Sequence, residues 1–401
     1  MSADERFRPL AKAPSNLPVG ESIIRGMTRA CEEYDAVNLA QGIPSYPLPH
    51  SVQEAAVDAI RSADNQYTAP RGSASFLQAI SAFEQRRWGM AEPYDPERQI
   101  CVTCGATEGM LASLIAVAEP GSNVIIIEPS YETYAVNLRL IGVEARYVRL
   151  RPPAWELDPA DVEAVVDDRT RAVIINSPHN PTGRVHSAAE LEGLGEVCVR
   201  HGIVAIHDAI YDELYFGSRP PARISGVPGM EQHAITVNAL SKMFSVTGWR
   251  VGWVTGSREL MERVMRVHDF LTIAAPSPLQ TAGTAALSLP QSYFTELRDV
   301  YRSRRDVLVG GLQKCGLEFH HPEGAYYVLC DATPLTRPGE SEEELTRRLL
   351  RECGVAVVPG LCFYGPDGEG RRPQIRIAFA KDEATVAEGT RRLLGYLECH
   401  S

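Results

Sequence analysis

One lysine in this sequence stands where its amine would be reactive. Lys242 lies in the segment NALSKMFSVTGWR (residues 238–250), among apolar and hydroxyl-bearing neighbours rather than on a charged surface stretch. An amine that is partly removed from water loses its proton more easily, because burial disfavours the charged form. A neutral lysine attacks carbonyl groups and forms a Schiff base with them. Arg250, eight residues further on, is a permanent cation whose fork of N–H groups suits a phosphate.

The segment CGATEG (residues 104–109) has the composition of a phosphate-binding turn. Gly105, Ala106 and Thr107 follow a short apolar run and precede a helix-like stretch. Backbone N–H groups at the start of a helix point at an anion, and a threonine hydroxyl can add a hydrogen bond. The pattern equally fits a simple strand-to-helix turn, and it matches neither the P-loop nor the G-x-G-x-x-G fingerprint.

Polar residues follow two other apolar runs. Asp208 ends the run IVAIHD, where an ionised carboxylate is costly unless it is paired. It either caps a helix or forms a salt bridge to the cation of a ligand, with Tyr211 one turn further on the same side. Asn180 stands between two prolines in SPHNPTGRV (residues 177–185), which either only makes a turn or aims the amide into a pocket.

These groups together match one cofactor. A lysine that forms a Schiff base, with an aspartate on the pyridinium nitrogen, is the recurring arrangement around pyridoxal 5'-phosphate (PLP). Asparagine, tyrosine, arginine and a phosphate turn complete the set. The sequence therefore predicts a PLP site.

The elements that would position these residues alternate between strands and helices. Seven short apolar runs lie at residues 100–104, 123–129, 144–150, 171–178, 202–209, 233–240 and 250–256. Helix-like segments separate most of them, and one begins with a capping-box spacing from Ser187 to Glu190. Such uniformly apolar runs indicate strands covered on both faces, and the alternation indicates a mostly parallel sheet. Ligands of these sheets bind at the carboxyl ends of the strands, where the polar residues above would meet.

The pattern changes after about residue 290. A long amphipathic stretch, apolar runs at residues 325–331, 355–360 and 374–380, and a closing helix predict a smaller α+β domain. We expect an N-terminal arm that joins the small domain (1–45), a large PLP-binding domain (46–288) and a C-terminal small domain (289–401).

Composition excludes several functional classes. A net charge of −11 speaks against a nucleic-acid partner. No stretch approaches the roughly 20 apolar residues that span a bilayer, and the N-terminal residues lack the apolar core of a secretory signal. We therefore expect a cytoplasmic protein with no membrane partner. Cys101 and Cys104 form a C-x-x-C pair with no second pair to complete a metal site, so no metal is expected.

The motifs and their order resemble the class I/II aminotransferase family of fold-type I PLP-dependent enzymes. They are NPTG at 180–183, Asp208 with Tyr211, Ser-Lys at 241–242 followed by TGWRVGW, and IRIAFA at 375–380. The resemblance runs from about residue 15 to the C-terminus and implies the fold-type I architecture, a seven-stranded sheet between helices plus a small α+β domain. NQYTAPRG at 65–72 and VIIIEPSYETY at 124–134 are similar to the kynurenine, glutamine and methionine aminotransferase branch.

The resemblance implies roles for particular residues. Lys242 would hold PLP as an internal aldimine and move the proton between the substrate and the cofactor. Asp208 would keep the pyridine nitrogen protonated, while Tyr211 and Asn180 would contact the ring hydroxyl. The phosphate would be bound by Gly105, Ala106, Thr107, Ser241 and Arg250.

The remaining implied roles concern the substrate and the assembly. Tyr131 would stack on the ring. Arg376 would clamp the substrate carboxylate with two parallel bonds, helped by Gly42 and Asn180. Tyr67 would reach the phosphate of the neighbouring subunit, which implies a homodimer.

Two departures from the family pattern bear on the reaction. Ala239 stands where a phosphate-binding hydroxyl is usual, and Ala209 follows Asp208. We expect an aminotransferase that moves the α-amino group of an L-amino acid to a 2-oxo acid. The alternative is a PLP-dependent lyase, a β/γ-replacement enzyme, or a cyclising or oxidising enzyme acting on an amino acid. Ile43 and Tyr46, with no second arginine in view, favour a neutral, aromatic or sulfur-containing substrate.

Overall fold

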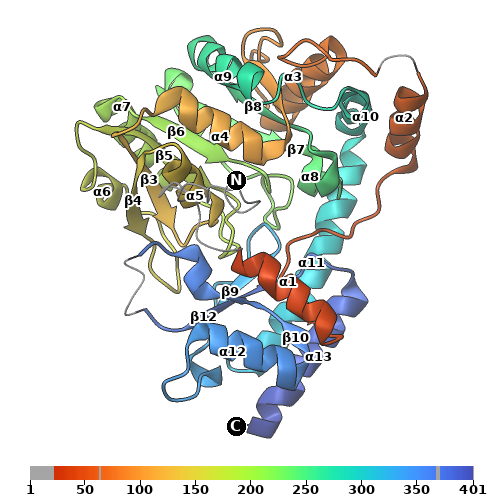
Figure 1. The fold of residues 1–401 in the computed structure, drawn as a ribbon, viewed down its shortest axis with the longest axis vertical. Helices are drawn as coiled ribbons and strands as arrows, with labels where there is room; N and C mark the ends of the chain where they lie inside the picture. The colour runs from red at the N-terminus through yellow and green to blue at the C-terminus, as the bar shows by residue number, and fades with distance from the viewer. Residues whose placement is uncertain (1–21, 63–64, 367–370, 401) are drawn as a thin grey trace, which may run out of the picture.

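The computed structural model describes residues 22–62, 65–366 and 371–400. Figure 1 shows two stacked parts, the upper one built on a large sheet and the lower one on smaller sheets. The large sheet has seven strands in the order β2-β8-β7-β6-β5-β3-β4. They are β2 (Ile100–Thr103), β3 (Asn123–Glu128), β4 (Glu144–Arg149), β5 (Thr170–Asn176), β6 (Val204–Asp208), β7 (Ala234–Ala239) and β8 (Gly252–Gly256). Each predicted apolar run overlaps one of these strands, so the sequence prediction of the sheet is confirmed.

Strand β8 alone runs against its neighbours. It pairs antiparallel with β2 and β7, whereas the other neighbouring pairs are parallel. The start of β8 therefore lies at the edge where the other strands end. This reversal brings Arg250, just before β8, to the same edge as Asp208 at the end of β6.

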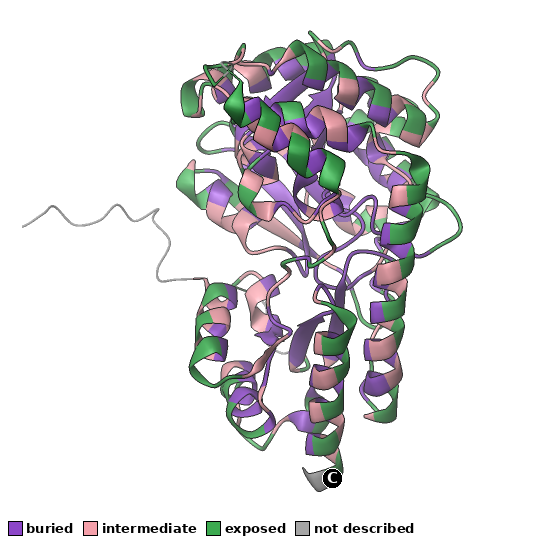
Figure 2. Cartoon of the chain, turned by 90° about the vertical axis from the view of Figure 1, so that its right-hand side faces the viewer, coloured by how far each residue is buried: buried purple, intermediate pink, exposed green. Residues whose placement is uncertain are grey.

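Helices cover both faces of the large sheet, which explains the uniformly apolar strands. One face packs on α4 (Gly105–Val117), α5 (Thr133–Leu140) and α9 (Arg258–Leu271), and the other on α7 (Ala188–His201). All six residues of β3 are buried. The predicted capping box is present at the start of α7, where the Ser187 hydroxyl accepts the Glu190 N–H. In Figure 2 the strands are buried while the outer helices expose one side.

The upper part also contains shorter and peripheral helices. They are α2 (His50–Arg61), α3 (Ala74–Trp88), α6 (Pro159–Glu163), α8 (Leu240–Met243) and α10 (Ser277–Leu287). Helix α3 packs on β2 and β8 through Phe76, Ile80 and Phe83.

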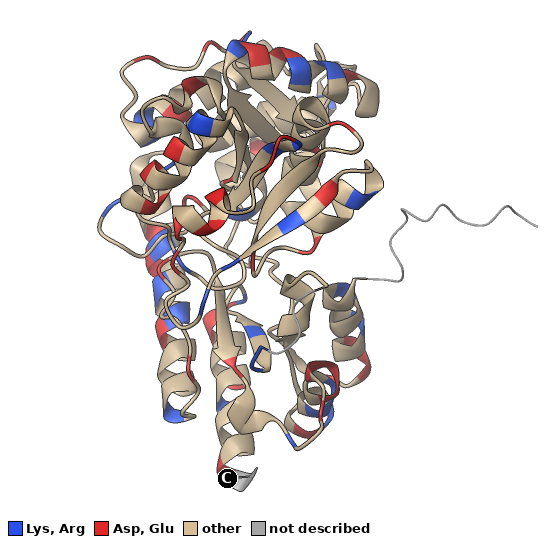
Figure 3. Cartoon of the chain, turned by 90° about the vertical axis from the view of Figure 1, so that its left-hand side faces the viewer, with Lys and Arg blue, Asp and Glu red and all other residues tan. Residues whose placement is uncertain are grey.

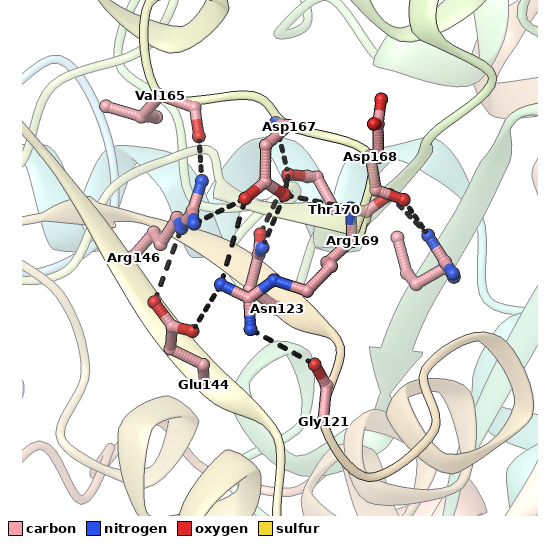
Figure 4. Close-up of polar contacts among 10 residues, drawn as sticks. Gly121, Asn123, Glu144, Arg146, Val165, Asp167, Asp168, Arg169 and Thr170 are labelled. Atoms are coloured by element: carbon pink, nitrogen blue, oxygen red, sulfur yellow. Dashed lines mark hydrogen bonds and ion pairs between the residues drawn. The ribbon is translucent and has the colours of Figure 1, made fainter.

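The amino ends of three strands are held by a polar network. Asn123 of β3 and Arg146 of β4 donate hydrogen bonds to Asp167, at 2.9 and 2.6 Å, just before β5. Arg169 bridges to Glu144, with 3.0 Å between Nη2 and Oε2 (Figure 4). The Asn123 hydrogen bond, with those from the Arg169 backbone and Arg146, lowers the pKa of Asp167. This network lies at the opposite edge of the sheet from Asp208.

The lower part contains two small sheets. Strands β9 (Tyr327–Asp331), β11 (Val358–Pro359) and β12 (Gln374–Ala378) form an antiparallel sheet in the order β11-β12-β9. Strand β1 (Val37–Asn38) pairs in parallel with β10 (Val355–Ala356). The run at residues 355–360, expected to be one strand, is therefore two, because its halves pair with different partners.

Four helices surround the small sheets. They are α1 (Ile23–Glu33), α11 (Gln291–Lys314), α12 (Glu342–Arg348) and α13 (Glu383–His400). Helix α11 runs from the upper part into the lower part, where it packs against α13 (Figure 1). Residues 1–21 of the expected arm lie outside the described residues, and the domain boundaries near 45 and 288 stay a prediction.

Candidate active site

A cavity of about 360 Å³ opens at the carboxyl ends of the parallel strands. It is bounded by β12 and β9 of the small sheet and by α1. The predicted site residues that line it are Gly42, Ala106, Thr107, Tyr131, Asn180, Asp208, Tyr211, Ser241, Lys242, Arg250 and Arg376. Two predicted residues do not line it. Gly105 lies against Arg250 at its edge, and Tyr67 is 77% exposed elsewhere.

Lys242 lies in the short helix α8, directly after β7 ends. Its Nζ donates to the Gly42 carbonyl at 3.1 Å and lies 5.9 Å from the centre of the Tyr326 ring. Burial lowers the pKa of Lys242 to about 8, with Asp208 opposing and Arg376 and Arg250 adding to the shift. The neutral, nucleophilic amine is therefore far more populated near neutral pH than in an exposed lysine.

Asp208 ends β6 beside the end of β5. Its carboxylate accepts the Tyr134 hydroxyl at 2.6 Å and the Ile210 N–H at 3.2 Å. Asn176, the last residue of β5, donates to the Asp208 carbonyl at 2.8 Å and accepts the Asn180 N–H at 2.8 Å. It thereby connects Asp208 and Asn180, which both line the cavity, to the end of β5. Burial raises the pKa of Asp208, while the Tyr134 and Ile210 hydrogen bonds oppose that shift. Asp208 thus caps the turn at Ile210 and also lines the cavity, while the salt bridge to a ligand cation stays a prediction.

The anion-binding corner forms where α4 begins. Gly105, at φ +78°, lets the chain turn into this 13-residue helix. A Cβ at Gly105 would lie 2.6 Å from the Arg250 guanidinium, so only glycine permits this approach. Arg250 itself adopts a left-handed φ of +54° and donates to the Cys104 carbonyl at 3.4 Å. Helix N–H groups, a guanidinium, and the Thr107 and Ser241 side chains form a donor set that suits a phosphate.

Arg376 is a buried cation in the middle of β12. Its Nη1 donates to Asn180 Oδ1 at 3.0 Å and its Nη2 to the Ala40 carbonyl at 2.8 Å. Its guanidinium carbon lies 4.3 Å from the centre of the Tyr327 ring and 4.9 Å from that of Phe363. The residue is 2% exposed, and none of the described carboxylates forms an ion pair with it. A buried guanidinium without a carboxylate partner is the feature expected of a site that receives one from a ligand.

The comparisons with known proteins assign the family. The model of "Aminotransferase class I and II" matches residues 34–393. This chain belongs to that family. It is 36% identical to the "Probable N-succinyldiaminopimelate aminotransferase DapC" of Mycobacterium tuberculosis, with 94% of this chain and 96% of the relative covered. It is 31% identical to the "Methionine aminotransferase" of Escherichia coli, with 96% and 97% covered.

Solved structures agree with this assignment. The structure of the M. tuberculosis N-succinyldiaminopimelate aminotransferase superposes with a TM-score of 0.91 at 35% identity, covering 96% of this chain and all of the other. That of the E. coli protein YbdL, described as having a methionine aminotransferase function, gives 0.90 at 31% identity over 96% of this chain and all of the other. The enzyme is therefore a PLP-dependent aminotransferase of fold type I, and the resemblance inferred from the sequence is confirmed.

The cavity residues fit PLP on structural grounds alone. A lysine with a lowered pKa, a buried carboxylate and an anion-binding corner line one cavity. Asp208 and Asn180 are held at adjacent strand ends by Asn176, between that corner and Arg376. Ser241, next to Lys242, lines the cavity, whereas Ala239 is fully buried in the core.

Three tyrosines of the site were not identified from the sequence. Tyr134 contacts Asp208, Tyr327 shares a hydrogen bond of 3.1 Å with Tyr211, and Tyr326 donates to the Gly42 carbonyl at 2.9 Å. A Cβ at Gly42 would lie 1.8 Å from the Tyr327 hydroxyl. The only available signal was the repetition of tyrosine in YETY and AYY, which does not say which ring faces a site.

The described residues also bear on other ligand classes. None of their helices is long and apolar enough to cross a membrane. Within the same ranges, no group of three or more His, Cys, Asp and Glu side chains is arranged to hold a metal ion. Figure 3 shows acidic and basic residues interspersed over the helices of that face rather than gathered into a basic stripe.

Proposed function

We propose that this aminotransferase transfers the α-amino group of an L-amino acid to a 2-oxo acid, with Lys242 as the residue that binds PLP covalently. The observation that carries the proposal is the buried Arg376 guanidinium, without an ion-pair partner among the described residues, in the cavity that also contains Lys242. An α-carboxylate supplies the missing counter-charge. Bound PLP supplies an aldehyde for the amine and a ring that withdraws electrons from the substrate α-carbon.

The chain's own residues then have distinct tasks. The Lys242 amine, with its pKa lowered to about 8, accepts and returns the proton of the substrate α-carbon. Asp208, with Tyr134 donating to it at 2.6 Å, holds a proton at the pyridine nitrogen. Tyr211 stays a neutral hydroxyl because burial raises its pKa, so it can donate to the ring oxygen together with the Asn180 amide. Arg376 orients the substrate through its carboxylate, so that the reacting hydrogen faces Lys242.

The residues at the start of α4 would hold the phosphate of PLP. Gly105, Ala106 and Thr107 present N–H and hydroxyl donors, and Arg250 and Ser241 close the corner. Tyr131 lines the cavity 5.9 Å from Tyr134, measured between ring centres. It would stack on the cofactor ring.

The substrate side chain is proposed to be neutral, aromatic or sulfur-containing. Ile24, Ile43 and Met110 give the cavity apolar wall that suits such a side chain. Two relatives carry names of this kind, the methionine aminotransferase of E. coli and the human "Kynurenine--oxoglutarate transaminase 1", which is 31% identical over 89% of this chain and 92% of its own length.

One residue favours a second candidate, a substrate whose side chain ends in a carboxylate. Arg25, in the first turn of α1, lines the cavity and makes no ion pair with any carboxylate of the described residues. The M. tuberculosis relative is named for such a substrate, N-succinyldiaminopimelate. Glu132 lines the same wall and accepts the Ser22 hydroxyl, so its negative charge opposes a second carboxylate.

An Arg25→Met variant separates the two candidates. Steady-state kinetics of the holoenzyme would compare methionine, phenylalanine, glutamate and an N-succinylated diamino acid, each with a 2-oxo acid acceptor. We expect the highest kcat/KM for the neutral substrates, with a change of less than about threefold in Arg25→Met, because Arg25 has no charge to pair with in them. A tenfold or larger loss confined to a carboxylate-ending substrate that the wild type prefers would establish the second candidate. Arg29→Met, one turn further along α1 and outside the cavity, is the matched control.

A homodimer with Tyr67 reaching the neighbouring site is also proposed. Three apolar residues are exposed, Tyr67 at 77%, Phe270 at 92% and Ile273 at 46%. The two segments that carry them are joined, since His268 Nε2 lies 3.0 Å from the Pro70 carbonyl. Ile273 adopts a φ of +67°, which is rare for a β-branched residue and is consistent with a functional role of this segment. An exposed apolar patch of this kind is typical of a protein–protein interface.

A Phe270→Asp variant tests the dimer. A carboxylate in the middle of an apolar interface is expected to weaken association and, because Tyr67 would then leave the neighbouring site, to lower PLP affinity. Sedimentation velocity and PLP titration measure the two effects. Val199→Asp, at an exposed apolar residue of α7, should change neither. Wild-type PLP affinity and activity in a monomeric Phe270→Asp protein would contradict the proposed role of Tyr67.

A further inference from the structure

A second group of buried charges lies behind the active site, outside the cavity. Arg87, in the last turn of α3, has its Nη1 2.9 Å from Asp212 Oδ1 and 2.9 Å from Glu213 Oε1. The side chains of all three are at most 5% exposed. The contacts are ion pairs rather than aligned hydrogen bonds, since no Arg87 N–H finds an acceptor in good geometry. None of the three residues lines the cavity.

The contacts of Asp212 lead to both catalytic segments. Asp212 follows Tyr211 directly, in the turn that begins at Asp208. Its Oδ2 accepts the Asn238 amide at 2.8 Å, and Asn238 Oδ1 accepts the Ala239 N–H at 2.8 Å. Ala239 is the last residue of β7, and α8 with Lys242 begins at the next residue. A chain of three contacts thus joins Arg87 to the segment that carries the lysine.

Glu213 connects the same turn to the long helix. Its Oε2 accepts Arg298 Nη1 of α11 at 2.8 Å, and both side chains are at most 10% exposed. Arg87 is therefore the cation that two adjacent carboxylates share. Without it, Glu213 would keep Arg298, but the buried Asp212 carboxylate would keep only the Asn238 amide. A buried carboxylate that loses its cation must move, become hydrated or take up a proton, and each of these changes disturbs the turn.

We infer that Arg87 is a positioning residue, which sets the placement of Tyr211 and Lys242 relative to each other through Asp212 and Asn238. A buried ion pair contributes little to stability compared with apolar residues of similar volume, so stability alone does not explain this arrangement. The segments that carry Tyr211 and Lys242 must keep fixed positions relative to each other, because misplacing a reacting group by about 1 Å costs on the order of 10²-fold in rate. The contacts through Asp212 and Asn238 fix those positions. The inference rests on the proposed role of Lys242.

The kinetic test uses Arg87→Met, which matches the unbranched side chain as far as Nε and removes the charged guanidinium. We expect kcat to fall on the order of 10²-fold, while KM for the amino acid changes by less than about threefold because Arg376 is untouched. Arg87→Lys, which keeps one charge without the fork, should recover part of kcat. The matched control is Arg146→Met, which breaks the ion pair with Asp167 at the opposite edge of the sheet (Figure 4) and should leave kcat unchanged.

A second readout needs no cofactor. The pH dependence of acetylation of each lysine in the apo chain, followed by peptide mass spectrometry, gives the pKa of Lys242 with Lys314 and Lys381 as internal references. Burial and the neighbouring Asp208 set that pKa to about 8, so a displaced Lys242 is expected to titrate elsewhere in Arg87→Met but not in Arg146→Met. An ordinary Lys242 pKa in the wild type would instead contradict the proposed function.

A folded Arg87→Met protein with wild-type kcat and wild-type Lys242 titration would overturn the inference. If Arg87→Met fails to fold, Asn238→Ala carries the test. It removes only the amide that links Asp212 to Ala239 and leaves every charge in place. The same selective fall in kcat is expected for it, and an unchanged kcat and Lys242 titration in Asn238→Ala would reject the positioning role.

Discussion

The Lys242→Ala variant is expected to bind PLP and to lose at least about 10³-fold in kcat. Binding survives because the anion-binding corner at Gly105 and Arg250 and the carboxylate of Asp208 are separate from the lysine. Turnover fails because no other lysine of the described residues lines the cavity. The sequence has four lysines, at 12, 242, 314 and 381, and of the three that the structure describes only Lys242 lines the cavity. Stopped-flow measurement of a half-reaction with one amino acid gives the loss directly.

Borohydride reduction identifies the bound lysine independently of activity. It should fix the cofactor on Lys242 in the wild type and on no residue in Lys242→Ala. Lys314→Ala, at the end of α11, is the matched control and should behave as the wild type. A pyridoxyl group recovered on Lys381 would mean that the nucleophile had been misassigned. The same half-reaction separates transamination from the lyase, replacement or oxidase alternatives, because a transaminase stops after one 2-oxo acid per site until an acceptor is added.

The sheet and the placement of the site residues could be predicted from the sequence because both depend on local pattern. Strands covered by helices on two faces are mostly apolar, so all seven runs were visible, although the edge strand β4 carries Glu144, Arg146 and Arg149. Once the sheet is parallel, the ends of its strands share an edge, and Asp208, Asn180 and Lys242 have to meet there. Arg250 fits the same rule because β8, which follows it, runs in the opposite direction.

Other features depend on contacts between distant segments and leave no local trace. Tyr131 and Tyr134 are equivalent in sequence terms and both line the cavity, yet it is Tyr134 that donates a hydrogen bond to Asp208. Arg25 was not identified as a second arginine, because only the packing of α1 against the small sheet brings it to the cavity wall. Arg304 stands in the charged run RSRR (residues 302–305), yet it is 5% exposed and donates to the Ala380 carbonyl at 3.3 Å.

The Asp208→Asn variant tests the other central assignment. Asparagine keeps the shape of the side chain, and its oxygen can still accept the Tyr134 hydroxyl or the Ile210 N–H, but it carries no negative charge. If the carboxylate holds a proton at the pyridine nitrogen, the variant binds PLP and loses about 10²- to 10⁴-fold in kcat, since electrostatic groups aimed at developing charge have effects of this order.

Tyr134→Phe separates the charge of Asp208 from its surroundings. It removes the hydroxyl that donates to Asp208 at 2.6 Å and leaves the carboxylate in place. A hydrogen bond to a charged group contributes about 1.5 kcal/mol or somewhat more, so a loss of roughly tenfold is expected. Asp208→Asn should therefore be much the more damaging change. If it retained kcat within about threefold of the wild type, Asp208 would act only as the cap of the turn that begins at Ile210, and the proton at the ring nitrogen would have to be held by another group.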